Sequence, residues 1–146
     1  QKTTNTIWSF IRKHYKVKKF GVIVTDSKTF PLKWGVIGTA LSHCGFRALN
    51  DYRGKKDLYG EKLKVAQVNV AEALAASAVF EMGEGNEQTP LVRITNVPFV
   101  QFQKRNPTKN ELASLKITIC ADLYSELLTR VTWVKGKKLI EKKRKH

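Results

Sequence analysis

The pattern of apolar and polar positions predicts two buried strands near the start of the chain. Residues 20–27 form a short apolar run rich in β-branched side chains, which favours a strand buried on both faces with Asp26 at its C-terminal edge. Residues 36–41 form a second apolar run, in which Gly38 indicates that another backbone or a ligand comes close. Pro31, between the two runs, indicates a turn.

Helical periodicity is clearest in the middle of the chain. Apolar and small residues recur there every three or four positions, so a helix is expected to begin at Asn69, its N-cap, and to stop at Gly83. Its wide stripe of small residues predicts tight packing on a sheet. Residues 3–16 predict a second helix, capped by Thr3 or Thr4, with a basic outer face.

The rest of the pattern predicts shorter elements. Strands are expected at 63–68, 91–94 and 131–134, an apolar segment at 97–102, and short helices at 106–115 and 121–128. A chain of 146 residues, 42% of them hydrophobic, is long enough for one core and short for two. The expected fold is therefore a single α+β domain, in which helices pack against a mixed β-sheet.

Charge and composition narrow the function classes. The net charge of +15 argues for a polyanionic partner, and the excess is concentrated at 12–19 and 135–145. No nucleic-acid-binding motif accompanies these clusters, so nucleic acid is not expected as a partner, although a small basic nucleic-acid-binding domain remains the alternative. No apolar run reaches 18 residues, and Cys44 and Cys120 are expected to be buried thiols, so we expect a cytoplasmic protein that does not enter a membrane.

Three polar groups are candidates for chemistry. Asp26 and Ser27 offer oxygen ligands for a hard divalent cation, unless Asp26 only caps a turn. The glycine-containing loop 82–89 can approach a phosphate or metal through its backbone, although such loops also occur in ordinary turns. Two short turns place Asp51, Arg53 and Asp57 within reach of one polar site, where Arg53 could grip a phosphate or carboxylate, with Lys33 as a helper.

The order of these groups resembles the coenzyme F(420):L-glutamate ligase family, the γ-glutamyl ligases. The resemblance rests on segments 24–27, 35–41, 51–54 and 57–60 and on the helix ending in Met82-Gly83-Glu84, and it covers the chain from about Lys2 to Gly136. It implies that residues 1–136 are the C-terminal portion of a longer family domain and that 137–146 are a basic tail. An acidic metal-binding motif of the family's N-terminal portion is not found in the chain.

The resemblance also implies an activity. Family members use GTP and a divalent metal, Mg or Mn, to join L-glutamate to a carboxylate of a coenzyme F(420) precursor, and the loop is similar to that of a branch thought to use a folate-type acceptor. The γ-phosphate of GTP would activate the carboxylate as an acyl phosphate, which the glutamate amine attacks. A homodimer is implied as well.

The resemblance assigns site residues by position. Asp26 and Ser27 match metal-binding residues, and Glu84 matches a ligand of a second metal, so the carboxylates of Asp26 and Glu84 are expected to converge on a shared cation. Asp51 and Arg53 are the catalytic candidates. The nucleotide-binding segment is expected to consist of Met82, Gly83, Glu84, Gly85, Asn86, Glu87, Gln88 and Thr89.

Overall fold

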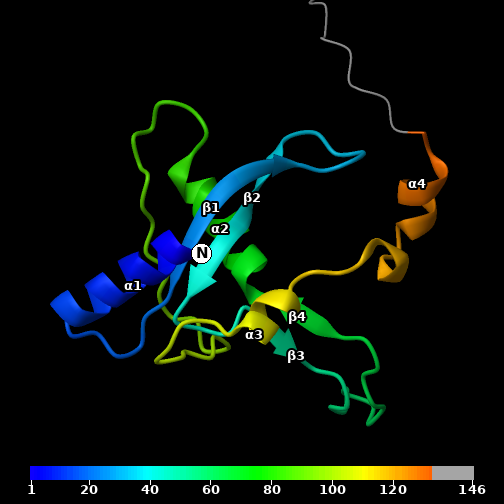
Figure 1. Ribbon diagram of the computed structural model, residues 1–146, viewed down its shortest axis with the longest axis horizontal. Coiled ribbons are helices and arrows are strands. Elements are labelled where there is room, and N and C mark those ends of the chain that lie inside the picture. The colour runs from blue at the N-terminus through cyan, green and yellow to red at the C-terminus, as the bar shows by residue number, and fades with distance from the viewer. Residues whose placement is uncertain (133–146) are drawn as a thin grey trace, which may run out of the picture. The chain divides into compact units, whose positions relative to one another are not determined.

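The computed structural model describes residues 1–132, which belong to two compact units, Gln1–Leu115 and Lys116–His146. The first unit contains α1 (Lys2–His14), β1 (Val22–Thr29), β2 (Val36–Cys44), β3 (Leu49–Asp51), β4 (Gln67–Asn69), α2 (Val70–Met82) and α3 (Lys109–Ala113) (Figure 1). The described part of the second unit contains the 3-10 turn η1 (Ile119–Ala121) and α4 (Ser125–Arg130).

The strands form two small antiparallel sheets. β1 pairs with β2, and β3 pairs with β4. The α+β class is therefore confirmed, but both pairs are antiparallel where a mixed sheet was expected. The short connection from Thr29 to Val36 explains this for the first pair, because a parallel pair needs a crossover of a dozen residues or more.

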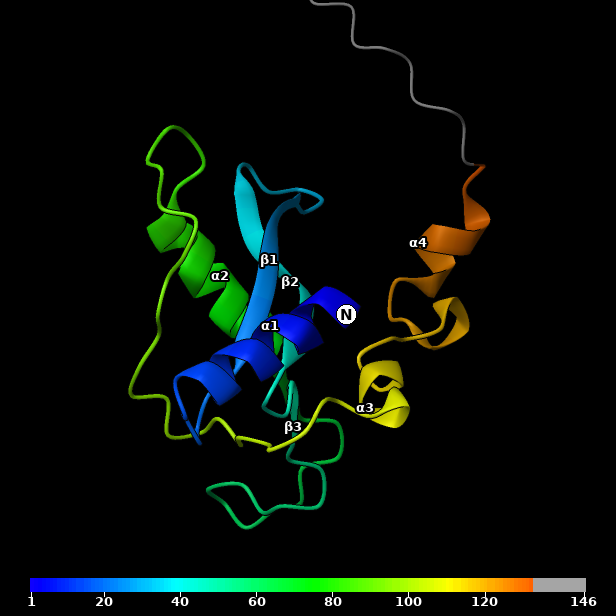
Figure 2. The same cartoon turned by 60° about the vertical axis from the view of Figure 1, so that its left-hand side comes forward.

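The two long helices pack on opposite faces of the β1–β2 hairpin (Figures 1 and 2). α2 covers the face that carries Gly38, and α1 packs on the opposite face through the buried side chains of Thr4 and Trp8. The Trp8 indole N–H donates to the Phe20 carbonyl at 2.9 Å, and the Thr4 hydroxyl contacts the Ser42 hydroxyl. A small core cluster, formed by Phe46, Ala48, Val70, Ala71 and Val100, packs against Ile23 of β1 and Ala40 of β2.

A bulge in β2 decides which of its residues face α2. The register moves by one residue at Leu41, because Thr25 pairs with Ala40 while the preceding residue of β1 pairs with Ser42. Side chains alternate between the faces of a strand, so one extra residue exchanges the two faces beyond it. As a result Gly38 and Ala40, rather than Leu41, lie on the side of α2.

Gly38 allows α2 to approach β2 closely. A Cβ atom at this position would lie 2.5 Å from the Ala75 carbonyl oxygen and 2.5 Å from Val79 Cβ. Real Cβ contacts are not this short, so only glycine fits between the strand and the helix. The close approach predicted from the sequence is confirmed, and the approaching backbone is that of α2.

The prediction for the first strand is wrong in two respects. β1 runs from Val22 to Thr29, so Asp26 lies inside the strand and not at its end. The strand is half-buried with several exposed positions, because a two-stranded hairpin covered by helices on only part of each face cannot bury both faces. The turn comes later, at Pro31–Gly35, where Leu32 and Gly35 have positive φ.

The prediction for α2 is confirmed at both ends. The Asn69 side chain accepts a hydrogen bond from the Glu72 N–H, and Gly83 ends the helix with a φ of 77°. For α1 the predicted cap is wrong, since Gln1 is the N-cap and Thr4 is already inside the helix, where its side chain is buried against β2.

The shorter elements are confirmed in part. Of the strand expected at 63–68, only the end belongs to β4, and residues 91–94 form no strand. The helix expected at 106–115 is α3, while η1 and α4 replace the one expected at 121–128. The strand expected at 131–134 and the basic tail lie largely outside the described residues.

The two cysteines differ from one another. Cys44 is buried, as expected, and burial raises the pKa of its thiol. Cys120, in η1, is exposed, so the expectation of two buried thiols is wrong for Cys120. Between residues 1 and 132, the structure has no helix with the length and apolar character needed to cross a bilayer.

Glu111 makes the start of α3 sensitive to acid. Hydrogen bonds from Arg105, and then from the Thr108 N–H, hold the pKa of the Glu111 carboxyl well below its usual range. A carboxyl with a lowered pKa stabilises the fold above its unfolded pKa, and the contribution is lost as pH falls toward the folded value. We expect the urea midpoint of the wild type to decrease as the pH drops below about 4.5, the ordinary pKa of a glutamate side chain.

The matched variants are Glu111→Gln and Glu61→Gln, the second removing an exposed loop carboxylate. Urea unfolding measured from pH 7 to pH 3 should show a smaller pH dependence for Glu111→Gln than for the wild type. The Glu61→Gln variant should follow the wild type. Equal pH dependence in all three proteins would contradict the assignment.

Candidate active site

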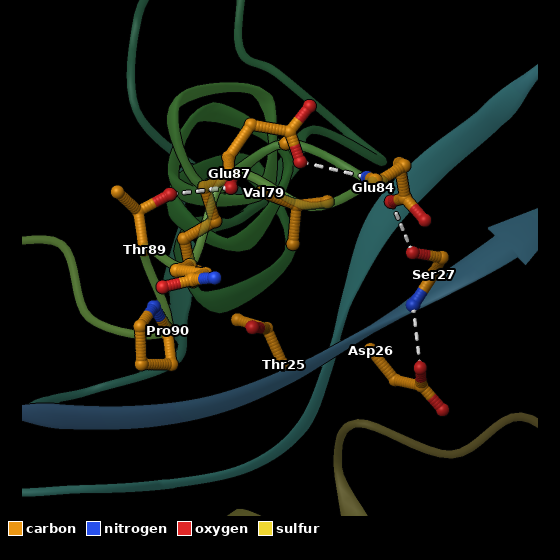
Figure 3. A pocket seen from close by; sticks show the side chains of 12 residues that line it. Thr25, Asp26, Ser27, Val79, Glu84, Glu87, Thr89 and Pro90 are labelled. Carbon is orange, nitrogen blue, oxygen red and sulfur yellow. Dashed lines mark hydrogen bonds between the residues drawn. The ribbon is translucent and has the colours of Figure 1, made fainter.

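A pocket of about 520 Å³ lies between β1 and the end of α2 (Figure 3). β1 contributes residues 25–27, and the loop that follows α2 contributes the opposite wall. The lining residues are Thr25, Asp26, Ser27, Val79, Met82, Gly83, Glu84, Gly85, Glu87, Gln88, Thr89 and Pro90. The pocket therefore brings together the strand and the loop in which the sequence placed its metal and nucleotide candidates, and of that loop only Asn86 is not in the lining.

Ser27 and Glu84 meet across the pocket. The Ser27 hydroxyl donates a hydrogen bond to the Glu84 carboxylate, and Figure 3 shows the two groups pointing toward one another. Fifty-seven positions separate the two residues in the sequence. Their contact depends on the bulge and on Gly38, which together bring α2 against this face of β1.

Asp26 points the other way. Its neighbour Ser27 faces α2, and successive side chains of a strand alternate, so the Asp26 carboxylate is directed away from Glu84 (Figure 3). It accepts a hydrogen bond from the Ser27 N–H at 2.8 Å. The expected convergence of Asp26 and Glu84 on a shared cation is therefore not seen, although both residues line the pocket.

The loop after α2 is closed at its base. The Thr89 hydroxyl donates to the carbonyl oxygen of Met82, the last residue of the helix, at 2.6 Å. Inside the loop, the Glu87 carboxylate accepts from the Gly85 N–H at 2.7 Å and folds over Gly83, where any Cβ would lie 2.4 Å from Glu87 Cδ. The positive φ of Gly83 explains why the loop begins with glycine.

The electrostatics of the pocket favour a cation. Three carboxylates, those of Asp26, Glu84 and Glu87, are in the lining, and none of the described lining residues is Lys, Arg or His. A phosphate would be repelled from such a surface unless a cation lay between them. Within residues 1–132 no three His, Cys, Asp or Glu side chains gather in a group that could hold a metal ion.

Asp51 and Arg53 are not in this pocket. Figures 1 and 2 show β3, which ends at Asp51, at the opposite end of the unit from the loop after α2. The Arg53 guanidinium donates to both Asp51 oxygens through Nε and Nη2, the shortest distance being 2.6 Å. These bonds lower the pKa of Asp51 to about 2. The pair is exposed, and the Asp57 carboxylate accepts hydrogen bonds from the Tyr59 and Glu61 N–H groups of its own turn.

Comparison with known proteins identifies the family of the chain. The model of one protein family, described as F(420)-0:gamma-glutamyl ligase, matches residues 1–96, which include β1, α2 and the whole loop after α2. The chain belongs to this family. Within this γ-glutamyl ligase family, the matched part of the chain holds all the metal, nucleotide and catalytic candidates.

Coenzyme F(420):L-glutamate ligases from several organisms are similar to this chain. The coenzyme F(420):L-glutamate ligase of Methanococcus maripaludis is 46% identical over 99 residues, which cover 68% of this chain and 39% of the relative. That of Methanocaldococcus jannaschii is 44% identical over 84 residues, covering 56% and 34%. That of Archaeoglobus fulgidus is 43% identical over 75 residues, covering 51% and 30%. The matched part thus spans about two fifths or less of each relative.

The structure shows one further residue that the sequence did not indicate. Glu72, in the first turn of α2, reaches β2, where its carboxylate accepts from the Thr39 hydroxyl at 2.9 Å and from the Ala40 N–H at 3.1 Å. A glutamate three positions after an Asn cap is the usual signal for a capping box. Here the side chain turns to the strand instead, next to the bulge.

Proposed function

We propose that this chain carries part of the active site of a GTP- and metal-dependent ligase. The reaction joins the amine of L-glutamate to a carboxylate of a coenzyme F(420) precursor or of a folate-type acceptor. The observation that carries the proposal is the contact of Ser27 and Glu84 across a pocket walled by the loop 82–89. Family membership and relatives named as coenzyme F(420):L-glutamate ligases support it.

The residues of the pocket fit a divalent cation such as Mg²⁺ or Mn²⁺. Ser27 and Glu84 would hold one cation through hard oxygen atoms, and Asp26, on the other side of β1, would hold a second. Mg²⁺ is commonly bound by one or two carboxylates together with waters and substrate phosphates, so an incomplete set of protein ligands suits it. A bound cation there would neutralise phosphate charge during transfer.

The loop 82–89 would receive the nucleotide. Its closed base, through Thr89 and Met82, fixes the two ends of the loop, and Glu87 holds the Gly85 segment folded. The glycines allow a phosphate or base to approach the backbone without a side chain between them. The role of these residues is to position GTP so that its γ-phosphate can activate the acceptor carboxylate.

Arg53 and Asp51 lie at the opposite end of the unit from this pocket, so they would bind a carboxylate at a separate place and not take part in phosphate transfer at the pocket. Asp51 engages Nε and Nη2 of the guanidinium, which leaves Nη1 to bind a second carboxylate, and Asp51 would hold the group in orientation. We further propose that residues 1–136 form the ligase-like part, that 137–146 are a basic tail, and that the protein is a cytoplasmic homodimer.

The test is a nucleotide titration on the chain. We expect GTP to bind in the presence of Mg²⁺ and to bind at least about 10-fold more weakly after chelation, because the acidic pocket repels phosphate. ATP should bind more weakly than GTP. Asp26→Asn should lower the metal-dependent affinity by about 10-fold, and Glu81→Gln, outside the pocket, should leave it unchanged. GTP affinity that chelation does not alter would refute the proposal.

A second candidate, binding of single-stranded nucleic acid, is favoured by the outer face of α1. Phe10 is 62% and Tyr15 67% exposed, with His14 in ring contact with both. Six Lys or Arg residues and no acidic residue precede Asp26. Exposed rings among cations can stack on bases. This candidate predicts oligonucleotide binding that weakens steeply with salt and does not respond to Mg²⁺ chelation, which the same sample can show.

A further inference from the structure

We propose that Glu72 is a positioning residue for the pocket, acting through the bulge of β2. The inference rests on the proposed function of that pocket, and it concerns a side chain that is not in its lining. Glu72 is partly buried at the start of α2, and Glu84 follows the other end of that helix. The two ends are therefore coupled by one rigid element.

The first step of the argument is the bond between Glu72 and the bulge. The carboxylate accepts from both Thr39 and Ala40, so a single oxygen fixes two consecutive residues of β2 beside the extra residue Leu41. A charged acceptor makes stronger hydrogen bonds than a neutral one. Leu41 is 61% exposed, so its burial does not hold the bulge in place.

The second step is the effect of the bulge on the faces of β2. Because of the extra residue, Gly38 and Ala40 face α2, and the helix reaches the strand at Ala75 and Val79. If the register lost the bulge, Leu41 would turn toward α2 and Gly38 away from it. A leucine in place of a small residue would separate the helix from the sheet.

The third step leads to the pocket. Ser27 pairs with Gly38, so its hydroxyl lies on the face that α2 approaches. Val79 lines the pocket, and Glu84 lies five residues further on. Movement of α2 away from β2 would therefore carry Glu84 away from Ser27. Glu72 keeps the proposed cation ligands together although it touches neither of them.

The experiment compares four ¹⁵N-labelled proteins: wild type, Glu72→Ala, Glu72→Gln and Glu81→Ala. Glu81 is an exposed glutamate of the same helix and serves as the matched control. Amide hydrogen exchange reports the Ala40 N–H, the amide resonance of Ser27 reports the pocket, and a Mn²⁺ titration reports cation affinity.

In Glu72→Ala we expect the Ala40 amide to exchange at least about 10-fold faster, the Ser27 resonance to shift, and Mn²⁺ affinity to fall by about 10- to 100-fold, as for outer partners of metal ligands. Glu72→Gln keeps an acceptor, although a neutral one, and should show smaller changes of the same kind. Glu81→Ala should match the wild type. These readouts would not move together if Glu72 only stabilised the helix.

Each failure has its own signature. Unchanged Ala40 exchange and an unchanged Ser27 resonance in the Glu72 variants would overturn the positioning role, whatever the metal does. If Glu72→Ala does not fold, a Glu72→Gln protein identical to the wild type in both readouts overturns it equally. Absence of Mn²⁺ binding by the wild type would instead overturn the proposed function, while the two amides still test the role of Glu72.

Discussion

The double variant Ser27→Ala, Glu84→Gln is expected to lose metal-dependent GTP binding by more than about 100-fold, since even outer partners of a metal are worth about 10- to 100-fold in affinity. The two groups are in direct contact, so we propose that they act on one cation. Removing either should therefore cost nearly as much as removing both. Isothermal titration calorimetry in the presence of Mg²⁺ measures the GTP affinity of Ser27→Ala, Glu84→Gln and the double variant.

This non-additivity separates a shared site from two independent ones. Distant, independent sites give effects that add, whereas groups that share one ligand do not. Glu81→Gln is the control, because it removes a glutamate from the same helix outside the pocket. Losses that add between Ser27→Ala and Glu84→Gln would contradict the shared cation, even if each loss were large.

The second large effect is expected on stability. Gly38→Val should reduce the free energy of unfolding by at least about 3 kcal/mol, the upper end of the usual cost of overpacking, which is a large part of the 5–15 kcal/mol of a typical domain. The added atoms meet the Ala75 carbonyl and Val79 Cβ, which cannot move without shifting the helix. The urea midpoint of the folded chain measures this effect.

Gly54→Ala provides the comparison. Gly54 has a φ of +80° and open space around it, so alanine there suffers only the strain of a left-handed conformation, about 1–2 kcal/mol. Gly38 has no such φ, and its substitution costs energy through contact alone. If Gly38→Val were less destabilising than Gly54→Ala, the close packing of α2 on β2 would not hold in solution.

Local signals were enough to predict both ends of α2 and a close approach at Gly38 of β2. The amide of Asn69 and the φ freedom of Gly83 act on adjacent backbone, and Gly38 interrupts an apolar run, so each could be interpreted from nearby residues. The family was indicated in another way, by the order of several motifs along the chain, and the comparison confirms it.

Features that depend on which segments meet could not be predicted. Residues 91–94 have the composition of a strand, but a strand requires a partner and the structure gives them none among residues 1–132. Asp26 lies inside β1 because the turn between β1 and β2 comes several residues after it. The direction of its side chain follows from the pairing of β1 with β2, since side chains alternate along a strand. Glu72 has the spacing of a capping box, so nothing in the sequence indicated its hydrogen bonds to Thr39 and Ala40 of β2.

The unequal surroundings of the two cysteines have a practical consequence. Thiol reagents need an accessible sulfur and a thiolate, and Cys44 offers neither readily, since it is enclosed and its pKa is raised. Cys120 is open to solvent. A maleimide dye should therefore attach at one place in the native chain, which permits single-molecule fluorescence on the protein without first replacing a cysteine.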